Sequence, residues 1–165
     1  SGASRDRQVA VRRAHFALAR KHRLPLLVHC LRAHSHLKRL MKEEALPEAG
    51  LLMHSYSGSN ELTPFYVEWG CQFSFAGPVT FEGARRPIEA LKLIPLERLM
   101  AETDAPDQAP HPHRGQRCEP AYLPLIVEAL ARARGEDLAV VRAATTANAR
   151  RFFHLTKVHS SSEPI

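Results

Sequence analysis

The chain has 165 residues, enough for one domain with a sizeable core, and its 44% hydrophobic and 24% charged residues are ordinary for a globular protein. No apolar run is long enough to span a membrane, and the three scattered cysteines form neither a disulfide framework nor a CxxC zinc motif. The net charge of +6 favours an anionic partner such as nucleic acid, although a solvated basic surface explains it equally well. With no signal-peptide core, we expect an intracellular protein, cytoplasmic or nuclear.

Periodic apolar residues and turn signals predict short strands that alternate with helices after a leading helix. Val11, Ala14 and Leu18 repeat at helical spacing, and Pro25 stops this first helix before the LLVHC run begins. In chain order we expect a helix over 8–22, a strand over 26–30, a helix over 34–44, a strand over 51–56, a helix over 57–69, a strand over 71–77, a helix over 84–93, a strand over 99–103, a Pro-rich loop over 105–120, and helices over 121–134 and 137–153.

The four strand–helix repeats predict an α/β fold with a parallel sheet, because strands covered on both faces read as continuous apolar runs. A closed (β/α)8 barrel, the TIM barrel, needs twice as many repeats. We therefore expect the chain to form about half of a TIM-barrel-type domain, with four βα units after the leading helix. Alone, such a sheet exposes two edges and an apolar inner face, so we expect self-association or pairing with a missing half-barrel.

Three short apolar runs end in potential metal ligands, at His29, His54 and Asp104. One βα unit takes roughly 25–30 residues, since a barrel of eight such units needs about 250. This spacing places His29 and His54 on consecutive strands and Asp104 two strands further on. The carboxyl ends of parallel strands share one mouth, and two imidazoles with a carboxylate suit Zn²⁺, Mn²⁺ or a similar hydrolytic metal.

Six stretches in order give the chain a resemblance to a known family: PLLVHC, MHSYSGS, FSFAGPVTF, PLERLMAETDAP, RGQRCEP and TTANARRFF. From about Gln8 to Leu155 the chain resembles the C-terminal part of the TatD family of metal-dependent deoxyribonucleases, in the amidohydrolase superfamily. We therefore treat residues 1–165 as a single partial domain of this type. The polar residues 156–165 are expected to form a disordered tail.

The resemblance implies a TIM barrel that binds divalent metal ions (Mg, Mn or Zn), two of them in an intact barrel, and hydrolyses DNA phosphodiester bonds. It implies that His29 and His54 hold one metal and Asp104 the other. Asp104 can also act as the catalytic group that accepts a proton from the attacking water. The His-x-His pair that the family carries on its first strand and its Gly-Glu-x-Gly-Leu-Asp segment have no counterpart in this sequence.

Three further residues are candidates for supporting roles. Arg114 matches the family's Arg-Gly pair, and its planar fork suits a phosphate group of the substrate. Ser57 stands where the helix over 57–69 is expected to open, so it is either a phosphate-binding residue or only the cap of that helix. Glu102 points to the same side of its strand as Asp104, either to hold a ligand in place or to form a structural hydrogen bond.

Three functions remain open from the sequence. The first is a TatD-type exonuclease that acts on DNA and is complete only when the barrel is complete. The second is a non-catalytic half-barrel that acts in binding or association. The third is an esterase of the same superfamily that acts on a small substrate.

Overall fold

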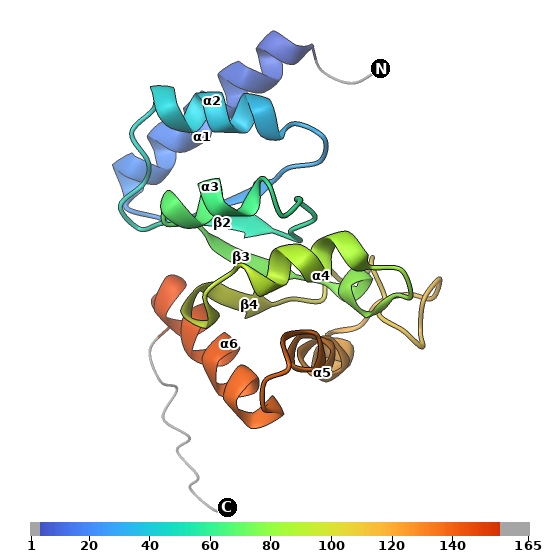
Figure 1. The fold of residues 1–165 in the computed structure, drawn as a ribbon. Coiled ribbons are helices and arrows are strands. Elements are labelled where there is room, and N and C mark those ends of the chain that lie inside the picture. Colours follow the sequence, from blue (N-terminus) through green and yellow to red (C-terminus); the bar gives the residue numbers. More distant parts are fainter. Residues whose placement is uncertain (1–3, 156–165) are drawn as a thin grey trace, which may run out of the picture.

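The computed structural model describes residues 4–155, and these form a parallel four-stranded sheet with helices packed against it (Figure 1). The strands follow one another in the order β1-β2-β3-β4, all parallel. Their bounds are β1 Leu26–His29, β2 Leu51–His54, β3 Gln72–Phe75 and β4 Leu99–Ala101. The predicted α/β class and the four strand positions are confirmed, whereas the tail predicted over 156–165 lies outside the described residues.

Residues 4–155 form six α-helices that precede, connect and follow the strands, in the positions that the apolar periodicity predicts. They are α1 Arg5–His22, α2 His34–Glu43, α3 Thr63–Glu68, α4 Arg85–Lys92, α5 Leu123–Arg134 and α6 Leu138–Phe152. None of the helices within residues 4–155 is long and apolar enough to cross a membrane.

The helix predicted over 57–69 is an exception, because α3 begins only at Thr63. Its opening turn is anchored at Ser59, whose carbonyl accepts hydrogen bonds from the backbone N–H groups of Leu62 and Thr63. Before this turn, the backbone at Gly58 passes so close to the Tyr56 ring that a Cβ there would lie 2.2 Å from the phenol oxygen. The predicted helix start at Ser57 is therefore wrong.

The two faces of the sheet are covered differently, because side chains alternate between faces along each strand. One face, which includes Val28, Met53 and Phe73, is buried in the main core against α2, α3, α4 and α5. The opposite face carries a smaller buried cluster, in which Leu52 and Met100 pack against Phe152 of α6.

Helix α6 is fastened to the start of β4 by a buried asparagine. The Asn148 side-chain amide donates hydrogen bonds to the carbonyl oxygens of Leu96 at 2.8 Å and Leu99 at 2.7 Å, and its own oxygen accepts one from Arg151 at 2.8 Å. Phe152 closes the same end of the sheet and approaches Gly50, where a Cβ would lie 3.0 Å from the Phe152 ring. These contacts fix the amino-terminal ends of the strands.

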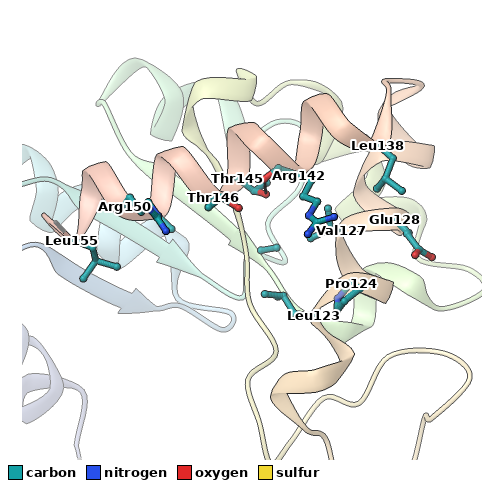
Figure 2. A pocket seen from close by; sticks show the side chains of 12 residues that line it. Leu123, Pro124, Val127, Glu128, Leu138, Arg142, Thr145, Thr146, Arg150 and Leu155 are labelled. Carbon is teal, nitrogen blue, oxygen red and sulfur yellow. Dashed lines mark hydrogen bonds between the residues drawn. The ribbon is translucent and has the colours of Figure 1, made fainter. Parts of the chain in front are cut away.

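Within the described residues, β1 and β4 each pair with one neighbour only, so both edges of the sheet are open. Leu27 on β1 is 50% exposed. Beside β4 lies a hollow of about 550 Å³, bordered by Ala101 of that strand and by side chains of α5 and α6 such as Leu123 and Leu138 (Figure 2). Apolar surface therefore lies uncovered along both edges.

We expect Asn148→Ala to lower the free energy of unfolding by about 1–3 kcal/mol, because it leaves two buried carbonyl groups without their donor. Urea denaturation at neutral pH measures this change. The exposed Asn60→Ala is the matched control and should stay within about 0.5 kcal/mol of the original chain. Equal stability of the two variants would contradict the anchoring role of Asn148.

Candidate metal centre

The carboxyl ends of the strands bring ionisable side chains together. His29 and His54 are the last residues of β1 and β2 and lie opposite each other in register, with ring centroids 5.8 Å apart. Glu102 follows β4 directly, and its backbone N–H bonds to the Phe75 carbonyl at 3.0 Å, which continues the pairing with β3. Asp104 comes two residues later, and its φ of 56° turns the chain at the strand end.

His54 lies between two carboxylates. Its Nδ1 is 2.9 Å from the carboxylate oxygens of Glu102, and its Nε2 is 3.4 Å from Oδ1 of Asp104. All three side chains are mostly buried, with exposed fractions between 20% and 29%. The structure therefore groups His54, Glu102 and Asp104 so closely that one atom of each lies within 4.8 Å of the others.

The hydrogen bonds of Glu102 determine the tautomer of His54. A carboxylate only accepts hydrogen bonds, so Nδ1 of His54 must carry the proton that it donates to Glu102. Glu102 is itself held in place, because Oγ of Ser74 donates to it at 2.6 Å. When His54 is neutral, its Nε2 lone pair is therefore directed at Asp104, as in a histidine that ligates a metal through Nε2 while a carboxylate orients its other nitrogen.

Nε2 of His54 and Oδ1 of Asp104 are placed as two ligand atoms of one divalent metal ion would be. A lone pair on Nε2 and a carboxylate oxygen are both acceptors, so their close approach requires a proton or a cation between them. In tetrahedral coordination with bonds of about 2.1 Å, neighbouring ligand atoms are about 3.4 Å apart. The observed 3.4 Å between His54 Nε2 and Asp104 Oδ1 equals this spacing, so the geometry suits one ion bound by both residues, whereas the resemblance implies a different ion for each.

The second oxygen of Asp104 is occupied by a neighbour in the following loop. Nε2 of Gln108 donates to Oδ2 of Asp104, and Oγ of Ser55 donates to Oε1 of Gln108 at 3.0 Å. The Gln108 backbone rests on Gly77, where a Cβ would lie 1.8 Å from the Gln108 carbonyl oxygen. The loops after β2, β3 and β4 therefore meet at Gln108, which contacts Asp104.

The structure brings His54 and Asp104 together as the strand-end argument predicts. His29 is their neighbour, but it is exposed and lies outside the group of three, in which Glu102 takes the third place. The period-two spacing of Glu102 and Asp104 is the sequence signal for this carboxylate, although spacing alone leaves open whether it touches a ligand.

The two predicted substrate-binding residues lie apart from the group of three. Ser57 is exposed and is not a helix cap, since Leu62 precedes the first residue of α3. Arg114 is exposed too, and its guanidinium carbon lies 4.5 Å above the ring of Phe81. Neither residue has a described hydrogen bond to His54 or Asp104.

A hollow of about 240 Å³ adjoins His29 at the carboxyl ends of the strands. Ser57 lines it together with Cys30 and Tyr56. Burial raises the pKa of the Tyr56 phenol to about 12 and also raises the pKa of the Cys30 thiol. Both groups are therefore uncharged at neutral pH, so the buried wall of the hollow is neutral beside the polar groups of His29 and Ser57.

A parallel α/β sheet with imidazole and carboxylate donors at the carboxyl ends of its strands is the arrangement of metal-dependent hydrolases with barrel folds. The model of the TatD related DNase family matches residues 1–154. The chain belongs to this family, and the predicted resemblance is confirmed at that level.

Comparison with individual relatives supports the same family membership. The chain is 37% identical over 151 residues to the uncharacterized metal-dependent hydrolase YabD of Bacillus subtilis. The aligned region covers 92% of this chain and 59% of the relative. It is 37% identical over 158 residues to the 3'-5' ssDNA/RNA exonuclease TatD of a Rahnella species, with the same two coverages. The chain thus spans less than two thirds of the length of these relatives.

Solved structures show the same fold. The structure of YjjV, a TatD homologue from Escherichia coli, superposes with a TM-score of 0.79 at 28% identity, over 86% of this chain and 54% of that one. A TatD family hydrolase from Entamoeba histolytica superposes with a TM-score of 0.80 at 20% identity.

We expect Gly77→Ala to displace the loop that carries Gln108, because the new Cβ would overlap the Gln108 carbonyl oxygen. The free energy of unfolding should fall by about 1–3 kcal/mol, and amide NMR signals of residues 104–108 should shift. Gly83→Ala is the control. Its positive φ makes the alanine strained, but the new Cβ meets no atom within 4 Å, so the 104–108 signals should stay in place. Unchanged 104–108 signals in Gly77→Ala would contradict the contact.

Proposed function

We propose that this chain provides the metal-binding part of a hydrolase that cleaves DNA phosphodiester bonds. The observation that supports it best is the pair of acceptor atoms, His54 Nε2 and Asp104 Oδ1, that face each other at 3.4 Å. His29, His54 and Asp104 are the proposed ligands of Mg²⁺, Mn²⁺ or Zn²⁺, with two ions in an intact barrel. The name of the Rahnella relative supports a nucleic acid as the substrate.

Each side chain has a separate task in this proposal. A divalent metal ion supplies the Lewis acidity that lowers the pKa of a water molecule and balances the negative charge on the phosphate. Glu102 accepts a hydrogen bond from Nδ1 of His54 and so holds the proton on that nitrogen, which leaves Nε2 free to bind the metal ion. Asp104 accepts a proton from the attacking water, whose oxygen bonds to phosphorus while the bond to the leaving nucleotide oxygen breaks.

The exposed residues bind the substrate in the same proposal. Arg114 offers two parallel N–H groups to a phosphate once it leaves the Phe81 ring. Ser57 lines the hollow beside His29, and its hydroxyl donates to a phosphate oxygen of the DNA strand in this proposal. The net charge of +6 attracts the polyanion to the protein as a whole.

The test is cleavage of end-labelled single-stranded DNA by the full chain with added Mg²⁺, Mn²⁺ or Zn²⁺. An incomplete barrel should cleave weakly or not at all. Where association completes the barrel, we expect metal-dependent release of nucleotides, and a loss of about 10²–10⁴-fold in Asp104→Asn, which keeps the size of the side chain but removes its basicity. Asp107→Asn changes an exposed aspartate of the same loop and should keep the activity. Cleavage that survives Asp104→Asn would contradict the proposal, and turnover of small esters unaffected by DNA would favour the esterase instead.

We also propose that the chain corresponds to the C-terminal half of a TatD barrel and associates through its open edges. The coverage of relatives supports a partial barrel, since YabD and YjjV are matched over only 59% and 54% of their lengths, and the six family motifs are the reason for placing it at the C-terminal end. The partly exposed Leu27 and the hollow beside β4 are apolar surfaces of the kind that association buries. Such a half-barrel could act in binding or association without catalysis.

We expect purified chain to associate with itself or with a half-barrel partner in a concentration-dependent way, measured by sedimentation velocity. Leu27→Lys places a charge on the open face and should weaken self-association at least tenfold. Leu93→Lys is the matched control, because Leu93 is 47% exposed but follows α4 on the helical side. A monomer at all concentrations would exclude self-association as the way in which the open edges are covered.

A further inference from the structure

The two carboxylate oxygens of Asp104 face different groups. Oδ1 lies 3.4 Å from Nε2 of His54, whereas Oδ2 accepts a hydrogen bond from the side-chain amide of Gln108. The carboxylate is thereby fixed in rotation about its own axis. One oxygen is held by the protein, and the other remains directed toward His54.

The orientation of the Gln108 amide follows from its two partners. Oδ2 of Asp104 only accepts hydrogen bonds, so the NH₂ end of Gln108 must point to it. The carbonyl end then points to Ser55, whose hydroxyl donates to Oε1 at 3.0 Å. Ser55 directly follows His54, so this chain of hydrogen bonds links the loops after β2 and β4.

The backbone supports the same arrangement. Ser55, Asp104 and Gln108 have φ values of 43°, 56° and 56°, in the left-handed region that non-glycine residues seldom occupy. The backbone N–H of Asp107 bonds to the Asp104 carbonyl at 2.9 Å and closes a turn between Asp104 and Gln108. Gly77 leaves room for the Gln108 carbonyl, as a Cβ there would not.

We propose that Gln108 is a positioning residue for the metal ligand Asp104 and that Ser55 acts through it. By occupying Oδ2, Gln108 directs Oδ1 to the point where His54 Nε2 also converges. Glu102 does the same for His54 from the other side, through Nδ1. This inference rests on the proposed function, since it concerns the affinity of the site for a metal ion.

A purely structural role for Gln108 makes a different prediction. If its hydrogen bonds only tie the loop to β2, their loss lowers the free energy of unfolding but leaves the metal affinity of the folded chain unchanged. If Gln108 positions Asp104, the affinity falls even in fully folded protein. Partners that orient metal ligands typically contribute 10–100-fold in metal affinity.

The experiment is titration calorimetry of the full chain with Zn²⁺, under conditions in which urea denaturation shows each variant to be folded. Binding at the site is defined as the part lost in Asp104→Asn. Gln108→Met keeps the length of the side chain but removes both hydrogen bonds, and Ser55→Ala removes only the distal one. Gln116→Met makes the same change at an exposed position of the same loop and is the control.

We expect Gln108→Met to raise the Zn²⁺ dissociation constant at least tenfold and Ser55→Ala to raise it by a smaller factor. The double variant should match Gln108→Met alone, because Ser55 acts only through Gln108. Gln116→Met should bind as the original chain does.

Two results would overturn the inference while leaving the proposed function in place. One is an unchanged dissociation constant in folded Gln108→Met, and the other is a Ser55→Ala effect that adds in full to the effect of Gln108→Met. If the original chain shows no Zn²⁺ binding that depends on Asp104, the proposed function fails and this inference fails with it.

Discussion

The candidate site depends on the position of one imidazole between two carboxylates. Glu102 binds Nδ1 of His54 and fixes both the ring orientation and the tautomer, so the Nε2 lone pair is directed at Asp104. Without Glu102 the ring could rotate or reverse its tautomer, and the two acceptor atoms would no longer be held at 3.4 Å. The proposed metal binding follows from this arrangement of acceptors rather than from the number of ionisable residues at the carboxyl ends of the strands.

The parallel sheet makes the arrangement possible. His54 ends β2 while Glu102 follows β4, and β3 lies between them with Ser74, which donates to Glu102 across the strands. Because all strands run in the same direction, their carboxyl ends and the loops that follow them meet at one edge. The opposite ends are fixed by Asn148 and Phe152 of α6, so the sheet is anchored at the end away from the candidate site.

Much of this could be predicted from the sequence, because buried parallel strands leave a clear signal. Apolar runs ending in His29, His54 and Asp104 located the strands and the edge at which the ligands gather. The sequence left the part played by Glu102 open, since spacing along a strand gives a shared face but not a partner. The helix expected at Ser57 was wrong because the Tyr56 ring and the turn at Ser59 delay its start, a tertiary effect that local turn signals do not contain. Gln108 was missed because its contact needs a left-handed backbone at residues other than glycine.

The central claim is that His54 and Asp104 bind one metal ion through Nε2 and a carboxylate oxygen. A crystal structure of the full chain with Zn²⁺, using anomalous scattering at the zinc edge, tests it most directly. The account predicts an anomalous peak about 2.1 Å from His54 Nε2 and from Oδ1 of Asp104, with Glu102 still bonded to Nδ1. A peak on the Nδ1 side of His54, or zinc bound only at other histidines, would contradict it.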